Sequence, residues 1–391
     1  MKLSLPEGSK AILDAEYPRF SAEEMARRRA AIEDLLEASG ADHLVYCGAN
    51  RVGSVVQWLT QWPVTAEAVG VLSPGKRDDL FVQYFNHLPQ ARRLAEADVT
   101  WGGESSIRAA ADALGRRKAR KDRVASIGPL SAEQHAVLAE RFGKIKSLNK
   151  DYVALRQIKS EEELDWLRIG AAFSDLGMQA LRDGLKAGLN ERQLGDLIER
   201  AYVAHGGVNV IHYLGVTGMN APRLAVPAQF PSTRKVQKGD VVFAEISASF
   251  WDHPGQVLRT FALGVEPVPL YKELHAAADA AFDAIAAVLR DGAMPGDVIA
   301  ASGVIEEAGF TTIDDLVHGY GGGYLPPILG TKSRPAGPVP DEPFRAGMTV
   351  VIQPNVTTPD GRAGVQTGEL VLINKGGIER LHAMPRGLVT V

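Results

Sequence analysis

The sequence contains one arrangement twice, and this duplication constrains the fold more than any other feature. The tetrad Leu-Arg-Asp-Gly occurs at residues 181–184 and again at 289–292. Each copy follows a long helical pattern and precedes a second helix that ends near a glycine, after which come patterns typical of strands. A solenoid needs three or more short repeats, so one long duplication predicts a domain built from two similar halves.

The duplicated region begins with a clear helix signal. Ser160 and Glu163 form a capping box ahead of a helix that we expect to run to about Leu181. The main strand patterns that follow cover residues 241–250, 257–264, 348–353 and 369–373. Helices followed by runs of strands predict an α+β domain with a mostly antiparallel sheet, over residues 156–391.

Residues 1–155 show a different pattern. A helix is predicted over residues 21–38, where Ser21 and Glu24 form a capping box. Short apolar runs bounded by Gly, Pro or Asp are typical of buried strands, and they cover residues 43–47, 68–72, 80–84 and 124–127. Strands separated by helices predict a smaller α/β domain at the N-terminus.

The composition excludes several functional classes. The chain has 391 residues, one cysteine and a formal net charge of −4. A single cysteine, Cys47, supports neither a disulfide framework nor a Cys-rich metal site. The slightly negative net charge does not indicate nucleic-acid binding. No apolar stretch approaches the roughly 18 residues of a membrane helix, and no signal-peptide pattern is present. We therefore expect a cytoplasmic protein that binds neither nucleic acid nor membrane.

Separated motifs in the second region carry a family resemblance. They are Gly-Asp-Val-Val-Phe-Ala-Glu at 239–245, Gln-Val-Leu-Arg-Thr-Phe at 256–261, His-Gly-Tyr-Gly at 318–321, Ile-Gln-Pro at 352–354 and Gly-Val-Gln-Thr-Gly-Glu at 364–369. In this order and spacing they resemble the pita-bread family of methionine aminopeptidases, prolidases and creatinase. The resemblance implies a C-terminal pita-bread fold, with a duplicated α/β half and an antiparallel sheet. The N-terminal region looks like the smaller leading domain of the prolidase and creatinase branch.

In the metallopeptidases of this family, five positions bind two metal ions. By the resemblance, these positions fall on Glu245, Gln256, His318, Gln353 and Gly368. Two ions need several carboxylates to bridge and neutralise them, and two glutamines and a glycine supply no charge. We therefore expect no dinuclear metal site and no cofactor, while a single weakly bound metal between Glu245 and His318 stays open.

Creatinase is the relative that works without metal, so the resemblance points to a creatinase-like, metal-free branch. Creatine itself is not expected, because two carboxylates of creatinase correspond to Leu258 and Gln353 here. The expectation is a metal-independent hydrolase that cleaves an amide- or amidine-type C–N bond in a small metabolite. His318 would relay the proton and Glu245 would orient or activate water. The alternatives are a lyase or decarboxylase acting by proton abstraction, or a non-catalytic module that binds a ligand or peptide.

Further candidates surround this pair. Glu369, beside the last matched position, is a third catalytic candidate. Residues expected to contact substrate in the same chain are Gln256, Gln353, Gln366, Tyr320, Tyr324, Arg334 and His253. In prolidase- and creatinase-like homodimers the small domain of one chain covers the active site of the other. By that resemblance we expect a homodimer in which Arg51, Trp58 and His87 contact the partner's site.

Overall fold

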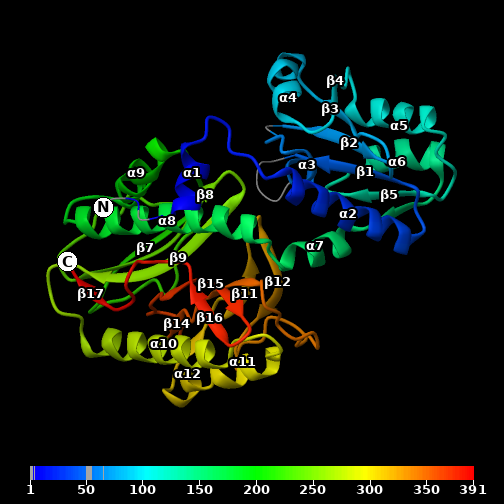
Figure 1. Cartoon of the computed structure of the whole chain (residues 1–391). Coiled ribbons are helices and arrows are strands. Elements are labelled where there is room, and N and C mark those ends of the chain that lie inside the picture. Colours follow the sequence, from blue (N-terminus) through cyan, green and yellow to red (C-terminus); the bar gives the residue numbers. More distant parts are fainter. Residues whose placement is uncertain (1–2, 4, 50–54, 65) are drawn as a thin grey trace. The chain divides into compact units, whose positions relative to one another are not determined.

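The computed structural model describes residues 3, 5–49, 55–64 and 66–391, and the chain divides into two compact units (Figure 1). One unit is Glu16–Arg156, and the other combines Met1–Ala15 with Gln157–Val391. No helix in the described ranges is long and apolar enough to cross a membrane.

The unit Glu16–Arg156 is built on a six-stranded sheet with the strand order β4-β3-β2-β1-β5-β6. Strand β1 pairs antiparallel with β2 and parallel with β5. The elements are α2 (Ala22–Ser39), β1 (His43–Gly48), α3 (Val55–Thr60), β2 (Ala68–Leu72), β3 (Asp79–Val82), η1 (Phe85–His87), α4 (Leu88–Leu94), β4 (Asp98–Trp101), α5 (Ser106–Arg116), β5 (Val124–Ile127), α6 (Ala132–Phe142), β6 (Ile145–Ser147) and α7 (Asn149–Gln157).

The predicted helix over residues 21–38 is confirmed as α2, and its ends follow from local chemistry. The Ser21 side chain accepts a hydrogen bond from the backbone N–H of Glu24, which satisfies one of the free donors of the first turn. Gly40 caps the other end with a φ of 70°, a left-handed conformation that glycine adopts without steric cost. The same unit keeps its strands β1 and β2 completely buried, as their apolar sequences predict.

The other unit is built on a nine-stranded sheet in the described residues. Its main path is β12-β11-β13-β15-β9-β8-β7, with β16 paired to β15 and β17 paired to β9. The elements are α1 (Glu7–Asp14), α8 (Glu161–Gly184), α9 (Glu191–Tyr202), η2 (Val203–His205), β7 (Gly207–Gly218), β8 (Asp240–Phe250), β9 (His253–Ala262), α10 (Pro269–Val288), α11 (Pro295–Ala301), α12 (Val304–Glu307), β10 (Thr311–Thr312), β11 (Val317–Tyr320), β12 (Tyr324–Leu329), β13 (Thr349–Ile352), β14 (Val356–Thr357), β15 (Gly368–Asn374), β16 (Gly377–Arg380) and β17 (Val389–Thr390).

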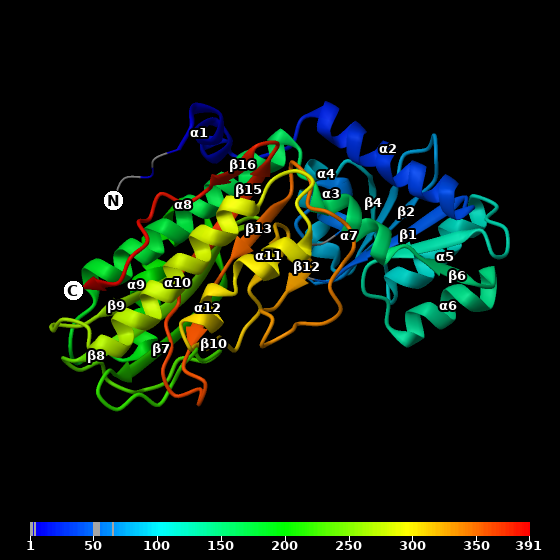
Figure 2. The same cartoon turned by 90° about the horizontal axis from the view of Figure 1, so that it is seen from below.

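The two Leu-Arg-Asp-Gly tetrads occupy equivalent places in this unit. The first forms the end of α8, and the second directly follows α10. Helices α8 and α9 precede β7–β9, while α10 and α11 precede β11–β15. Figure 1 shows the first helix pair and the second on opposite sides of the strands, and Figure 2 shows α10 and α11 in front of them from below. The pattern read from the sequence is therefore a structural duplication.

The first helix of the chain lies with this second unit. The Ser9 hydroxyl of α1 donates to the Asp165 carboxylate of α8 at 3.5 Å. Helix α1 thus packs with the C-terminal region, whereas the sequence patterns grouped it with residues 16–155. A helix this short has no intrinsic signal for its packing partner, because its stability comes from tertiary contacts.

Candidate functional site

Strands β8 and β9 direct polar side chains to one face of the nine-stranded sheet. Ser247 pairs directly with Gln256, and Glu245 lies two residues before Ser247. Residues paired across strands, and residues two apart on one strand, point to the same face. On the next strand, β7, Tyr213 pairs with Glu245 and so adds its side chain to this face.

A pocket of about 460 Å³ lies between α9 and β7, and none of the Glu245, Gln256, Gln353 and Gln366 side chains is among its lining residues. The volume falls in the range of about 300–1,000 Å³ that is usual for small-molecule sites. The residues that line the pocket are Arg192, Gly195, Asp196, Glu199, Asn209, Val210, Ile211, His212, Tyr213, Leu214, Gln229 and Pro231.

Four side chains form the Glu245 cluster: Glu245, Gln256, Gln353 and Gln366. The Nε2 atom of Gln256 donates to Glu245 Oε1 at 2.9 Å and to Gln353 Oε1 at 3.1 Å. The Nε2 atom of Gln366 donates to Glu245 Oε2 at 3.4 Å. Gln353 in turn donates to the backbone carbonyl of Asp315 at 3.2 Å. Each oxygen of the Glu245 carboxyl therefore receives an amide N–H.

Burial makes the Glu245 carboxyl a weak acid. Loss of hydration, and then the charges of Asp314 and Asp315, raise the pKa of Glu245 to about 8. Burial also raises the pKa of Asp314, although Asn355 donates a hydrogen bond to its carboxylate at 3.1 Å. Glu245 is therefore mostly protonated at neutral pH, and it is available as a proton donor.

Asp314 and Asp315 are site residues that the motif analysis missed. They follow β10 and shortly precede His318, in a stretch with no element of its own. The available signal was the adjacent acidic pair just before a motif histidine. A pair of fully exposed charges in a loop gives the same sequence pattern, so the position of this pair beside Glu245 could not be predicted.

His318 on β11 is held as a neutral imidazole. Burial lowers the pKa of His318, and the nearby charge of Asp315 and hydrogen bonds with Gly319 and Gln353 offset this only in part. Its Nδ1 atom lies 3.1 Å from the carbonyl oxygen of Gly319. A carbonyl oxygen only accepts hydrogen bonds, so Nδ1 carries the hydrogen and Nε2 keeps the lone pair. Gln353 favours the protonated form of His318 and so lies beside its ring, which places the imidazole next to the Glu245 cluster.

Two predicted tyrosines flank His318. The Tyr324 ring stacks on the imidazole with centroids 4.1 Å apart, and Tyr324 is 50% exposed. The Tyr320 ring contacts the imidazole edge-on at 5.5 Å and is buried. Burial raises the pKa of Tyr320, so its hydroxyl stays protonated. Tyr320 is therefore a hydrogen-bond donor inside the site, and Tyr324 forms part of its exposed wall.

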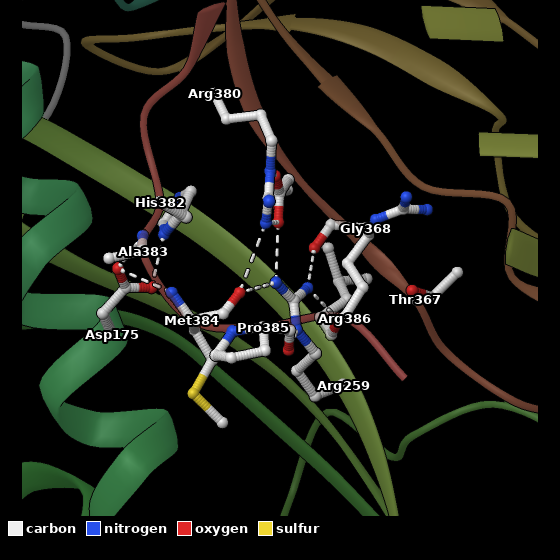
Figure 3. Close-up of polar contacts among 12 residues, drawn as sticks. Asp175, Arg259, Thr367, Gly368, Arg380, His382, Ala383, Met384, Pro385 and Arg386 are labelled. Atoms are coloured by element: carbon white, nitrogen blue, oxygen red, sulfur yellow. Dashed lines mark hydrogen bonds and ion pairs between the residues drawn. The ribbon is translucent and has the colours of Figure 1, made fainter. Parts of the chain in front are cut away.

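Glu369 lies in a separate ion-pair network with Arg259 and Arg380. Figure 3 shows these two arginines close together near Met384. The Oε2 atom of Glu369 accepts from Arg259 at 2.6 Å, and Arg380 binds both carboxylate oxygens. Burial opposes ionisation, but the hydrogen bonds of Arg380 and the charge of Arg259 lower the pKa of Glu369 below its ordinary value. Arg259 also donates to the carbonyls of Gly368 and Met384. This carboxylate is thus fully engaged by two guanidinium groups, away from the Glu245 cluster.

Two other candidates of this unit also lie apart from the cluster. His253 is buried at the start of β9, with Nδ1 2.8 Å from an oxygen of Asp252 and its ring 5.3 Å from that of Trp166. Arg334 is exposed in the loop after β12. The structure therefore brings together the three glutamines, the two tyrosines, Glu245 and His318, and leaves these two outside.

The candidates expected to reach a partner's site all fall within residues 16–156. One of them, Arg51, lies outside the described residues. Trp58 is buried within α3, where its ring contacts Tyr152 edge-on at 5.5 Å. His87 ends the short helix η1 and contacts the rings of Trp62 and Tyr84. Trp58 thus belongs to the core of its unit. The homodimer itself stays a prediction.

The five positions matched to metal ligands do not form a dinuclear donor set. In the described part of the chain, no group of three or more His, Cys, Asp or Glu side chains is placed to hold a metal ion. At Gly368, an added Cβ would lie 2.5 Å from the Ile352 carbonyl oxygen, closer than real Cβ atoms come. A carboxylate at this position would require the backbone of β13 or β15 to move.

Solved structures share this architecture. The Xaa-Pro dipeptidase from Bacillus anthracis matches with a TM-score of 0.80 and 18% identity, covering 94% of this chain and 100% of that one. The dipeptidase PepE from Mycobacterium ulcerans matches with a TM-score of 0.78 and 24% identity, covering 95% and 99%. At these identities the likeness shows the fold alone. It confirms the predicted pita-bread domain preceded by a smaller α/β domain.

Curated relatives match over about two thirds of their length. The probable dipeptidase PepE from Mycobacterium tuberculosis is 29% identical over 261 residues, which are 65% of this chain and 66% of the relative. The Xaa-Pro dipeptidase from Pyrococcus horikoshii is 24% identical over 257 residues, which are 64% of this chain and 68% of the relative.

The family model for metallopeptidase family M24 matches residues 165–375, more than half of the chain. Together with the dipeptidase relatives, this match overturns part of the expected function. The prediction of a metal-independent, creatinase-like hydrolase acting on a non-peptide C–N bond is wrong, because these relatives are named as peptidases. Its lyase, decarboxylase and binding-module alternatives fall with it, whereas the broader assignment as a hydrolase is supported. The chain belongs to metallopeptidase family M24.

Proposed function

We propose that this protein hydrolyses the peptide bond of short peptides, with Glu245 as the proton donor and His318 as the base. The observation that carries the proposal is the Glu245 cluster. It holds a buried carboxyl, whose pKa is raised to about 8, and Gln353 of the same cluster lies beside a histidine whose pKa is lowered. The dipeptidase names of the relatives support a peptide substrate.

The family name implies a metal centre, but the residues at the matched positions do not fit a dinuclear one. Gln256 and Gln353 supply neutral amides that are hydrogen-bonded to each other, and Gly368 supplies no side chain. Neutral amides neither bridge two divalent ions nor balance their charge. The proposed proton transfers therefore use only side chains of this chain.

The two titratable groups suit opposite halves of amide hydrolysis. His318, neutral at pH 7, takes a proton from the attacking water as the C–O bond forms. Glu245, protonated at pH 7, gives its proton to the departing nitrogen as the C–N bond breaks. Environments that push two pKa values apart assign one group as base and the other as acid. The Tyr320 hydroxyl is the donor available to the carbonyl oxygen, which becomes negatively charged.

A panel of dipeptides tests the proposal. Wild-type protein should convert at least one dipeptide, Xaa-Pro members included, into two free amino acids, as measured by mass spectrometry. Each dipeptide is incubated with and without added Mn²⁺, so that the result does not depend on how the protein was purified. If no dipeptide or tripeptide is cleaved under either condition, the proposed function is wrong.

The pH dependence of hydrolysis follows from the two pKa shifts. Activity should rise as the pH increases through the lowered pKa of His318, below its ordinary value near 6.5, because only the neutral imidazole is a base. It should fall as the pH increases through about 8, because Glu245 then loses the proton that it donates. The measurement is kcat/KM between about pH 5 and about pH 10, which reports the free enzyme. A plateau that continues above about pH 9 would contradict the role of Glu245.

A further inference from the structure

The pocket between α9 and β7 follows an open edge of the nine-stranded sheet. Strand β7 ends the path of this sheet, and β8 is its only strand partner among the described residues. Six consecutive residues of β7, 209–214, line the pocket. Side chains of a strand alternate between its two faces, so a cavity that touches six residues in a row follows the edge of the strand.

The main chain of β7 is available along this edge. The carbonyl oxygen of Leu214 accepts a hydrogen bond from the backbone N–H of Ala228 at 3.1 Å, so the polar groups of Leu214 point away from β8. In an antiparallel pair this direction recurs at every second residue, which places the N–H and C=O of His212 on the same outer side. The isolated bridges of β7 in the described ranges involve Leu214 and Gly218, not His212. Such an unpaired edge is a template for a further strand.

The wall opposite β7 carries opposite charges at its two ends. Arg192, Asp196 and Glu199 line the pocket from α9. Asp196 is neutralised by its ion pair with Arg200, whereas Arg192 forms no ion pair with any residue that the structure describes. Seven helical residues separate Arg192 from Glu199, which corresponds to a rise of about 10 Å. One end of the pocket is therefore positive and the other end, at Glu199, is negative.

Glu199 keeps its negative charge despite a histidine beside it. Its Oε1 atom accepts from Asn209 Nδ2 at 2.8 Å and lies 3.4 Å from Nδ1 of His212. Burial lowers the pKa of His212 to about 4, so the imidazole is uncharged at pH 7. Neither neighbour neutralises the carboxylate, which is 46% exposed and can bind a cation of a ligand.

The direction of the charges along β7 is fixed by two hydrogen bonds. Asn209, which binds Glu199, begins the lining segment of β7. Glu191, next to Arg192, accepts from the backbone N–H of Ser232 at 2.5 Å, beside the lining residue Pro231. The loop before Pro231 is bonded to Leu214 through Ala228, so Arg192 lies toward the other end of the lining segment.

We propose that this pocket binds a peptide of about three residues with free termini, as an added strand on β7, with its ammonium group beside Glu199 and its carboxylate beside Arg192. An extended chain spans about 3.3–3.6 Å per residue, so three residues cover the 10 Å between the two charges. Main-chain hydrogen bonds to the strand edge supply affinity, as in other complexes that add a strand to a sheet. The peptide runs in the same direction as β7. The site is separate from the Glu245 cluster, and the proposal does not rest on peptide hydrolysis.

Titration with three peptides tests the two charged contacts. The peptides are trialanine, trialanine amide without a carboxylate, and N-acetyltrialanine without an ammonium group. All proteins carry Glu245→Gln, so that the peptides stay intact whether or not the chain is a peptidase. By isothermal titration, this parent protein should bind trialanine about threefold to fivefold more tightly than either blocked peptide, because each block removes one partly exposed ion pair. No measurable binding of trialanine, or equal affinity for all three peptides, overturns the proposal.

Substitutions on α9 assign each terminus to its contact. Arg192→Gln should bind trialanine and its amide equally, while it still discriminates against N-acetyltrialanine. Glu199→Gln, which keeps an acceptor for Asn209, should show the reverse. Arg290→Gln is the matched control, since Arg290 is exposed and does not line the pocket, and it should bind as the parent does. If both α9 variants are folded and keep the preferences of the parent, the termini bind elsewhere and the proposal is wrong.

The titrations and the hydrolysis assay separate the two proposals. Terminus preferences that disappear in the α9 variants, without cleavage of any peptide by the wild-type chain, would support the β7 site and reject the peptidase function. Cleavage of dipeptides by the wild-type chain, with preferences that do not depend on Arg192 or Glu199, would support the peptidase function and reject the β7 site.

Discussion

Replacement of Glu369 by alanine is expected to lower the free energy of unfolding by about 3–5 kcal/mol. The side chains of Glu369 and Arg259 are 0% and 1% exposed, and they bind each other at 2.6 Å. Removal of the carboxylate leaves the Arg259 guanidinium buried without a counter-charge. Arg380 is 45% exposed and can turn toward water, so Arg259 accounts for most of the loss. Urea unfolding of the purified variant measures the change.

Glu379→Ala is the matched control for this prediction. Glu379 lies on β16, and its ion pair with Arg168 at 3.3 Å is partly exposed. Exposed pairs contribute little, so its loss should cost less than about 1 kcal/mol. If Glu369→Ala unfolds like wild type and yet loses peptide hydrolysis, Glu369 acts in catalysis rather than in the ion-pair network.

For Glu369, the sequence predicted the strand but not the ion pairs. The strand that carries it was predicted, because its apolar alternation and its place in the motif order are properties of the sequence. Its partners were not predictable. Arg259 reaches it from β9 and Arg380 from β16, and the carbonyl of Met384 helps to hold both guanidinium groups. These contacts depend on tertiary packing that no local pattern encodes.

The Glu245 cluster was easier to anticipate, because the family resemblance placed its residues at matched positions of one site. Glu245, Gln256 and Gln353 fall on three of these positions, and the structure joins them by hydrogen bonds. Asp314 and Asp315 lie outside strands, and no local pattern indicates that they are partly buried and act on Glu245. The predicted reaction was wrong. The changed residues at the positions matched to metal ligands were interpreted as a change of substrate class, whereas the relatives are named as peptidases.

Replacement of Glu245 by glutamine is expected to reduce kcat/KM for a dipeptide by a factor of about 10² to 10⁴. The amide has the shape of the protonated carboxyl and keeps hydrogen-bonding capacity toward Gln256 and Gln366, so the fold should be unchanged. It cannot give up a proton at any pH of interest. His318→Gln should cause a loss of similar size, because it removes the base while keeping a polar side chain.

The most direct measurement is kcat/KM of Glu245→Gln and wild type on the same dipeptide at pH 7, with Gln237→Met as the surface control. Circular dichroism and the unfolding midpoint establish that all three proteins are folded. The account predicts that Glu245→Gln is at least about 100-fold slower than wild type, while Gln237→Met is unchanged. A folded Glu245→Gln protein that cleaves the dipeptide at the wild-type rate would contradict the assignment of Glu245 as the proton donor.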